Sequence, residues 1–129
     1  LHENYFERAP ELHIDFTARA VVDRRELLDA VSVKDRYEQT TLSFRIEEGK
    51  LITKTVMTSS GTEEEGTIGG EVEGELEETC FNIDYVRDFL RCMRSKEVVL
   101  EFAGKDKPMK IYEAGIGYEV GAILAPYIP

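Results

Sequence analysis

The segment from Asn82 to Ser95 constrains the fold more than any other part of the sequence. Asn82 is a favourable N-cap residue, because its side-chain oxygen can accept a hydrogen bond from a backbone N–H of the first helical turn. The apolar residues that follow recur at i, i+3, i+4 and i+7, the spacing of one helix face: Val86, Phe89, Leu90 and Met93. The pattern predicts a helix over about 83–95 with one unambiguous inner face.

A shorter helix with the same internal spacing is predicted earlier in the chain. Asp23, followed three residues later by Glu26, resembles a capping box, and the helix is expected over roughly 24–31. The two helices carry apolar pairs at equal offsets from their caps: Leu27 with Val31, and Val86 with Leu90. This match indicates an internal duplication.

The rest of the chain has the pattern of β-strands. Residues 59–78 are rich in glutamate and glycine, yet Ile68, Val72 and Leu76 recur at even spacing, which predicts a loop followed by an acidic, half-exposed strand. Alternating or apolar runs predict six further strands, the second and third forming a hairpin that turns at Glu48 and Gly49: 11–22, 42–46, 51–58, 98–102, 109–112 and 119–124.

The composition indicates one globular domain with an acidic surface. The chain has 129 residues, of which 42% are hydrophobic, and no apolar run resembles a signal peptide or could cross a bilayer. We therefore expect a cytoplasmic protein with a single domain over 11–129, preceded by a tail or interdomain linker over 1–10. Because the formal net charge is −10, any surface that faces DNA must be locally basic.

No group of residues suggests catalysis, a metal or another cofactor. His2 and His13 have no second ligand at i+2 or i+4, and the run Glu63–Glu65 is typical of solvated charge in a Gly/Ser/Thr-rich loop. The glycines that follow this run lack the Lys-Ser/Thr ending of a phosphate-binding loop. Cys80 and Cys92 are predicted to be buried free thiols. We expect a protein that is not an enzyme.

Arginines lie on the face opposite the apolar residues in both predicted helices. They are Arg24, Arg25, Arg87, Arg91 and Arg94. If the two helices pack side by side on a sheet, these arginines form one cationic surface that can follow a phosphate backbone. The alternative is that Asp29, Asp84 and Asp88 neutralise them at i+3 or i+4, which would leave ordinary solvated helices.

Four segments occur in an order that points to a known family. They are Val22–Ala30, Leu42–Leu51, Phe81–Leu90 with its Phe-Asn-x-x-Tyr start, and the closing stretch 97–129. In this order the chain resembles the C-terminal domain of the DNA polymerase III beta subunit, the bacterial sliding clamp. The resemblance covers residues 11–129, and its specificity lies in the order of the segments, the Phe-Asn-x-x-Tyr start and the ending.

The resemblance implies an α+β DNA-clamp (processivity) fold, with two helices packed on antiparallel sheet and an internal β-α-β-β-β duplication. In the family, three such domains per chain and two chains per ring surround DNA, and the helices line the central hole. The resemblance therefore implies that the five arginines meet the phosphates of double-stranded DNA loosely and without reading bases. It also implies a polymerase processivity factor that acts in a homo-oligomeric ring and uses no cofactor.

The resemblance further implies a pocket that binds short linear motifs of DNA polymerase, clamp loader and repair proteins. The positions that match it are Tyr37, Asn82, Tyr85, Pro108, Met109, Ile123, Leu124, Ala125, Pro126 and Tyr127. The alternative, taken from the residues alone, is that Tyr85, Ile123 and Leu124 are core residues.

The chain departs from the family pattern in two places. Between Ala30 and Leu42 it is roughly five residues shorter, in a region that contributes to the contact between clamp subunits. At the C-terminus it carries Ala125, Tyr127, Ile128 and Pro129 where the family tends to have Met, Met or Val, Arg and Leu. Two functions therefore stay open: a domain of a ring-forming clamp, or a stand-alone clamp-fold module that binds peptides but neither forms a ring nor contacts DNA.

Overall fold

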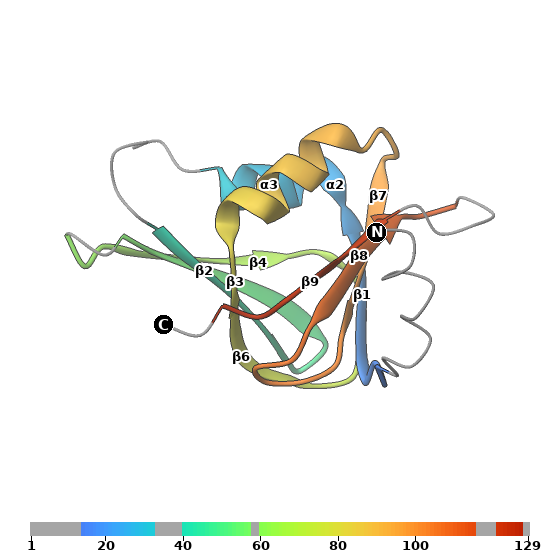
Figure 1. The fold of residues 1–129 in the computed structure, drawn as a ribbon, viewed down its shortest axis with the longest axis horizontal. Helices are drawn as coiled ribbons and strands as arrows, with labels where there is room; N and C mark the ends of the chain where they lie inside the picture. Colours follow the sequence, from blue (N-terminus) through green and yellow to red (C-terminus); the bar gives the residue numbers. More distant parts are fainter. Residues whose placement is uncertain (1–13, 33–39, 58–59, 116–120, 128–129) are drawn as a thin grey trace, which may run out of the picture.

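Two antiparallel sheets with two helices packed at one end make up the structure (Figure 1). The computed structural model describes residues 14–32, 40–57, 60–115 and 121–127, so the tail or linker predicted over 1–10 lies outside the described residues. The elements are β1 (Ala18–Asp23), α2 (Arg24–Val31), β2 (Thr40–Glu47), β3 (Lys50–Met57), β4 (Glu63–Ile68), β5 (Gly70–Glu73), β6 (Leu76–Phe81), α3 (Ile83–Cys92), β7 (Glu97–Phe102), β8 (Met109–Glu113) and β9 (Gly121–Leu124).

The strand order confirms the predicted duplication and shows that the two halves exchange strands. One sheet has the order β5-β1-β7-β8-β9 and the other the order β4-β3-β2-β6. Each half contributes a meander, β2-β3-β4 or β7-β8-β9, while its first strand joins the meander of the other half. Thus β1 pairs with β7, and β6 pairs with β2. Both halves follow the order β-α-β-β-β, and β5 is an additional strand between them.

Both helices begin at the predicted cap residues. The Asp23 carboxylate accepts a hydrogen bond of 2.9 Å from the backbone N–H of Glu26. The Asn82 side-chain oxygen accepts the equivalent bond of 3.1 Å from the N–H of Tyr85. These caps satisfy amides that have no partner within the helix. The bounds of α2 are those predicted from the sequence.

The second helix, α3, ends three residues earlier than predicted, at Cys92 instead of Ser95. Its C-cap, Met93, is already extended, with φ −81° and ψ 153°. The next two backbone N–H groups, of Arg94 and Ser95, both donate to the carboxylate of Glu113 on β8. A carboxylate from a distant strand satisfies these amides. The helix can therefore end at Cys92, although Met93 continues its apolar spacing.

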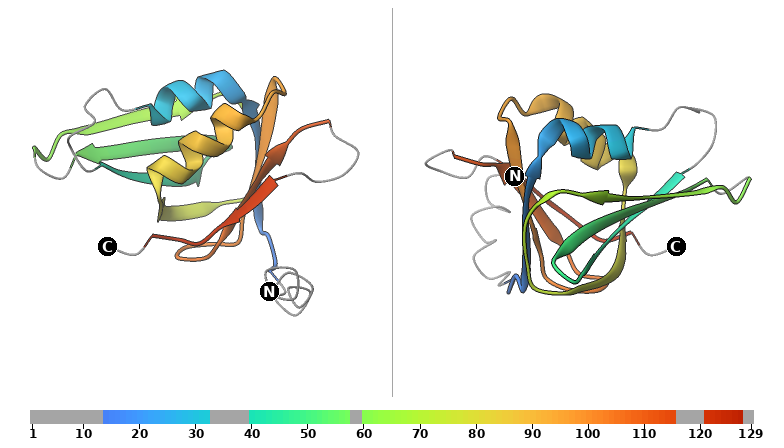
Figure 2. Two further views of the ribbon diagram at one scale, coloured as in Figure 1. Left: turned by 45° about the horizontal axis from the view of Figure 1, so that its top comes forward. Right: turned by 180° about the vertical axis from the view of Figure 1, so that it is seen from behind.

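The hydrophobic core lies between the sheets and beneath the helices (Figure 2). Three fully buried rings form its centre: Phe44 of β2, Phe81 of β6 and Phe102 of β7. Their centroids are 5.6, 6.1 and 6.4 Å apart, within the range of favourable aromatic pairs. Because Phe102 comes from one sheet and the other two rings from the second, this cluster joins the sheets. The helices add the predicted apolar pairs, Leu27 with Val31 and Val86 with Leu90.

The acidic stretch 59–78 contains more strand than the sequence predicts. It holds β4, β5 and the start of β6, and the chain passes from one sheet to the other between β4 and β5. Ile68 and Leu76 are buried and Val72 packs against the core, as their even spacing indicates. By contrast, the first predicted strand is shorter than expected, because residues 14–17 lie outside the ladder of β1.

The hairpin between β2 and β3 turns where the sequence predicts. Glu48 and Gly49 both have positive φ, 51° and 74°. Two consecutive residues of this kind are the requirement of a type I′ turn, which matches the twist of the paired strands. The glycine adopts its angle without steric cost.

Candidate functional site

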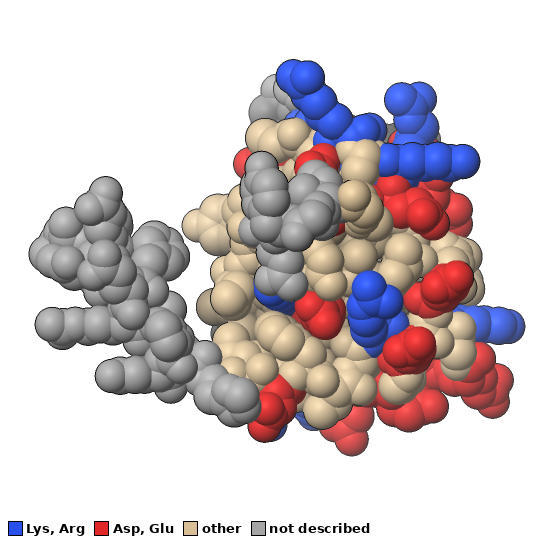
Figure 3. All heavy atoms as spheres, turned by 90° about the vertical axis from the view of Figure 1, so that its right-hand side faces the viewer, with Lys and Arg blue, Asp and Glu red and all other residues tan. Residues whose placement is uncertain are grey.

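Three of the five predicted arginines are exposed near one end of the helix pair. They are Arg25 of α2, Arg91 in the last turn of α3, and Arg94 just after it. Within the described residues, their side chains make no hydrogen bond or ion pair. α2 and α3 pack against each other, so these cations belong to one region. In Figure 3, Lys and Arg side chains gather at the top, on the side of the helices, and Asp and Glu lie mainly below.

Arg24, which was predicted to be exposed, is instead half-buried. Its Nε donates to the backbone carbonyl of Ser95 over 2.8 Å, and its Nη1 donates to that of Leu90 over 3.1 Å. The expectation was wrong because a helical wheel places Arg24 on the outer side of α2 without showing that the end of α3 lies there.

Arg87 is the arginine to which the neutralisation alternative applies. It forms an ion pair of 2.6 Å with Asp84, three residues earlier, and a longer one of 4.0 Å with Asp88. No equivalent pair joins Arg25 to Asp29, or Arg91 to Asp88, among the described residues. The free positive charge therefore lies toward the C-terminal end of α3.

Exposed apolar residues lie at the other end of α3 and on the segment that packs near it. The large hydrophobic residues exposed among those described are Tyr85, Ile123 and Tyr127, with 59%, 60% and 41% of their surface accessible. We call these three residues the exposed apolar patch. Tyr85 lies in the first turn of α3, Ile123 lies on β9, which packs against α3, and Tyr127 follows β9. All three belong to the predicted peptide-binding set.

Backbone contacts bring the segments around the patch together. The N–H of Tyr127 donates to the carbonyl of Cys80 on β6 over 2.8 Å, so the chain after β9 runs beside the strand that leads into α3. The N–H of Asp106 donates to Thr79 Oγ1 over 3.1 Å, which holds the β7–β8 loop against the same strand. Pro108, in that loop, is half-buried.

The predicted peptide-binding residues divide into surface and core. Met109 and Leu124 are buried register partners on β8 and β9, so the core alternative applies to Leu124. It does not apply to Tyr85 and Ile123, which are exposed. The division follows from the pleat of β9, whose successive side chains point to opposite faces.

Three of the remaining members of the set lie close to the patch in sequence. Asn82 is exposed, although its side-chain oxygen is engaged as the N-cap of α3. Ala125 is exposed and Pro126 is half-buried. Tyr37 lies outside the described residues.

Glycine at position 121 allows β9 to reach its place. A Cβ atom added there would lie 2.1 Å from the carbonyl oxygen of Ile111 and 2.6 Å from the Cβ of Tyr112, both on β8. Any larger residue would force β9 away from β8. The strand that carries Ile123 therefore depends on this close approach, and no pattern in the sequence indicates it.

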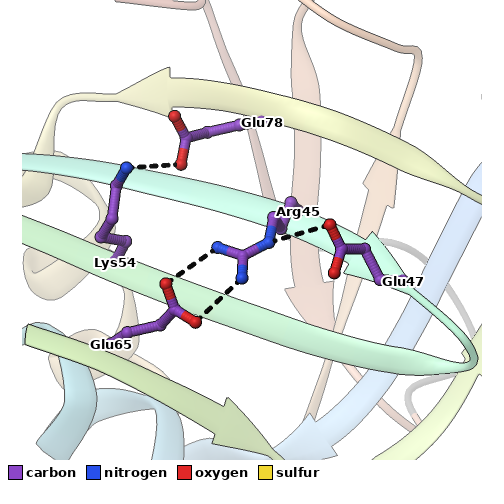
Figure 4. Close-up of polar contacts among 5 residues, drawn as sticks. All are labelled: Arg45, Glu47, Lys54, Glu65 and Glu78. Atoms are coloured by element: carbon purple, nitrogen blue, oxygen red, sulfur yellow. Dashed lines mark hydrogen bonds and ion pairs between the residues drawn. The ribbon is translucent and has the colours of Figure 1, made fainter.

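Three glutamates of the second sheet pair with cations (Figure 4). Arg45 binds Glu65 over 2.8 Å and Glu47 over 3.2 Å, and Lys54 binds Glu78 over 2.9 Å. Hydrogen bonds to these cations lower the pKa of Glu65 and of Glu78. Within the described residues, no group of three or more His, Cys, Asp or Glu side chains could hold a metal ion.

The two cysteines are free, but they are not both buried as predicted. Cys80 is half-buried, and burial is the main cause that raises its thiol pKa. Cys92 is exposed at the end of α3, on the side away from the core. Neither described helix is long and apolar enough to cross a membrane.

The sequence matches a known protein family, and the fold matches solved structures. The family model described as "DNA polymerase III beta subunit, C-terminal domain" matches residues 12–120. The chain belongs to this family. The match spans both helices and reaches the segment before β9. No curated protein matches the sequence.

Solved sliding clamps share the fold of this clamp domain. The Pseudomonas aeruginosa sliding clamp with ligand superimposes with a TM-score of 0.76 at 20% identity, covering 96% of this chain and 34% of that one. The Bartonella birtlesii clamp superimposes with a TM-score of 0.74 at 22% identity, and the match covers 91% of this chain and 32% of that one. The Bacillus subtilis clamp superimposes with a TM-score of 0.73 at 18% identity, and the match covers 89% of this chain and 31% of that one. The chain thus spans about a third of the length of the clamps that it matches.

The two halves of the clamp domain differ at the position three residues after each helix cap. In the first half this residue is Glu26, whose carboxylate accepts the N–H of Gly69 over 3.2 Å, where the chain leaves β4 for β5. In the second half it is Tyr85, whose ring is exposed. The residue at this position is thus engaged by the chain itself in the first half, whereas in the second half it is an exposed ring.

Proposed function

We propose that this protein is a sliding-clamp domain without chemistry of its own, which supports processive synthesis by a DNA polymerase. In this proposal residues 11–129 act as one clamp domain, residues 1–10 are a tail or linker, and the helices face double-stranded DNA within a ring. The opposite end of α3 recruits DNA polymerase, clamp loader and repair proteins. The observation that carries the proposal is the exposed apolar patch, in a domain whose family is shown by its sequence.

The patch has the properties of a site for a short extended peptide. Tyr85 supplies a large ring from a helix end that its cap holds in place, and Ile123 supplies an aliphatic wall from a paired strand. A partner's leucine or aromatic side chain would bury both. Since the peptide must lose conformational freedom on binding, the affinity is expected to be moderate and exchange fast. Fast exchange allows several partners to share one site.

Peptide binding tests this part of the proposal. A fluorescent clamp-motif peptide is titrated with the wild type, Tyr85→Ala, Tyr85→Phe and the surface control Lys50→Ala, after circular dichroism shows that each is folded. We expect Ala to lose most of the binding, because the ring is removed. Phe, which keeps the ring, should retain most of it, and Lys50→Ala should bind like the wild type. If the folded wild type does not bind, the peptide site is refuted.

The helix surface suits loose contact with DNA. Arg25, Arg91 and Arg94 are exposed cations, and phosphate contacts carry no base information. Each such contact adds about 0.9 to the slope of log affinity against log salt. Three contacts on an acidic protein give weak, salt-sensitive binding, which is compatible with sliding.

A second candidate is a stand-alone clamp-fold module that binds peptides without forming a ring. One observation favours it, because Arg24 and Arg87 are engaged within the protein. One expectation from the resemblance also favours it, namely that the chain between Ala30 and Leu42 is short for the family. Sedimentation velocity of the native full-length protein, together with an assay of its retention on closed circular DNA, separates the candidates. A stable assembly that retains closed circular DNA and releases it on linearisation supports the clamp, whereas a monomer that binds only the peptide supports the module.

A further inference from the structure

The turn between α3 and β7 is held by the first residue of α2. The Arg24 guanidinium donates to the carbonyls of Ser95 and Leu90 over 2.8 and 3.1 Å. The backbone N–H of Arg24 donates to the carbonyl of Lys96 over 2.8 Å. One residue therefore satisfies a carbonyl in the last turn of α3 and two in the following turn. Its positive charge lies at the negative end of the α3 dipole.

The same turn is also held by a residue of β8. One carboxylate oxygen of Glu113 accepts the backbone N–H groups of Arg94 and Ser95, the latter over 3.0 Å. These two hydrogen bonds, with the nearby charges of Arg24 and Arg94, lower the pKa of Glu113, so the carboxylate is ionised at neutral pH. Arg24 takes the carbonyls of the turn and Glu113 takes its amides.

The exposed arginines lie in or next to this turn. Arg91 lies one residue before the end of α3, and Arg94 lies within the turn and donates its own backbone N–H to Glu113. Arg25 is the neighbour of Arg24 on α2. The backbone of all three is thus fixed by, or adjacent to, the contacts of Arg24 and Glu113, while their side chains make no hydrogen bond or ion pair with another described residue.

We infer that Arg24 and Glu113 are positioning residues, which hold Arg25, Arg91 and Arg94 in the arrangement that meets DNA and do not themselves contact it. The inference rests on the proposed DNA contact of the helix surface. It assigns a DNA-related role to an acidic side chain, Glu113, whose charge by itself opposes DNA binding. It also removes Arg24 from the set of phosphate contacts.

Substitution of Arg24 separates positioning from contact. Binding of a short DNA duplex is measured by NMR titration at low salt for the wild type, Arg24→Lys, Arg24→Gln and the control Lys50→Ala. A lysine keeps the charge, but its single ammonium cannot reproduce the planar fork of a guanidinium. We expect Lys and Gln to weaken binding equally, by roughly threefold or more, which is about the change in affinity that one phosphate contact shows between 50 and 200 mM salt. Wild-type affinity in Arg24→Lys, with loss in Gln, overturns the inference in favour of direct contact.

Glu113 gives a test in which the two explanations have opposite signs. If only charge matters, Glu113→Ala removes a negative group near the cations and tightens DNA binding. Positioning predicts that Ala weakens binding, also by roughly threefold or more, because two amides of the turn lose their acceptor. Glu113→Gln, which keeps an acceptor oxygen, should recover most of the affinity. Tighter binding by the folded Ala variant overturns the inference.

Side-chain NMR signals distinguish failure of the inference from failure of the proposed function. In the wild type, the Nε–H signal of Arg24 should exchange slowly with water and stay unchanged on adding DNA, while those of Arg25, Arg91 and Arg94 shift. If no arginine signal responds to DNA in the folded protein, the proposed DNA contact and its positioning are both refuted. If DNA shifts Arg24 as much as Arg91, the DNA contact stands and the inference fails.

Discussion

Replacing Phe44 tests whether the three-ring cluster joins the two sheets. Phe44 is fully buried on β2 and pairs with Phe102 of the other sheet at 5.6 Å and with Phe81 at 6.1 Å. Phe44→Ala removes both ring pairs and leaves a cavity between the sheets. Phe44→Leu removes the same ring pairs but fills most of the space.

The two substitutions should differ in magnitude. Truncation of a buried Phe to Ala costs about 3–5 kcal/mol of unfolding free energy, from lost transfer energy and the cavity. Leu should lose chiefly the two aromatic pairs, at about 0.5–1.5 kcal/mol each, or roughly 1–3 kcal/mol together. Since small domains are stable by about 5–15 kcal/mol, the Ala variant is expected to lose a large share of its stability, and to be partly unfolded if the wild type lies at the low end of that range.

Urea denaturation followed by circular dichroism measures both losses, with Tyr85→Ala as a control on an exposed aromatic residue. That control should change the unfolding free energy by less than about 1 kcal/mol, because most of its ring is already in water. A loss at Phe44→Ala no larger than that at Tyr85→Ala would refute the reasoning that this cluster is the centre of the core. Equal losses for Ala and Leu would refute the cavity contribution.

Three further predictions follow from local geometry. Backbone hydrogen bonds lower the pKa of Glu113 below its ordinary value of 4.5. The ionised carboxylate therefore stabilises the fold above pH 4.5, and this stabilisation is lost as the pH falls through the lowered pKa. Glu113→Gln should therefore show a shallower fall of melting temperature in acid; an unchanged slope would contradict this. Gly121→Ala should lower the free energy of unfolding by roughly 1–3 kcal/mol, because its Cβ would lie 2.1 Å from the carbonyl oxygen of Ile111. It should also weaken peptide binding. An unchanged midpoint of urea denaturation would contradict this prediction. Exposed Cys92 should react with a thiol reagent before Cys80, whose pKa burial raises, so Cys92→Ser should abolish the fast phase.

Features with local causes could be predicted from the sequence. The caps Asp23 and Asn82 and the turn at Glu48 and Gly49 depend on residues a few positions apart, and the structure has them where the pattern indicates. The inner faces of both helices follow from their 3.6-residue periodicity. The duplication, visible in the sequence as equal offsets in two helices, is confirmed by the strand order.

Features with distant causes could not be predicted. The carbonyls that engage Arg24 are 66 and 71 positions away, so no helical wheel shows that this arginine is internal. The early end of α3 depends on Glu113, 18 and 19 positions from the amides that it accepts. The family resemblance placed the candidate pocket, but alternation alone could not decide whether Ile123 or Leu124 faces outward, because both are apolar.

The two candidate surfaces occupy opposite ends of α3, and both arise from differences between the duplicated halves. At the start of α3, Tyr85 is exposed, whereas Glu26 at the equivalent position of the first half accepts the N–H of Gly69. At its other end, Arg24 of the first half holds the turn of the second. Arg91 is six residues from Tyr85, which at 1.5 Å per residue is a rise of about 9 Å along the helix axis. The proposed peptide contact and the proposed DNA contact therefore use different side chains.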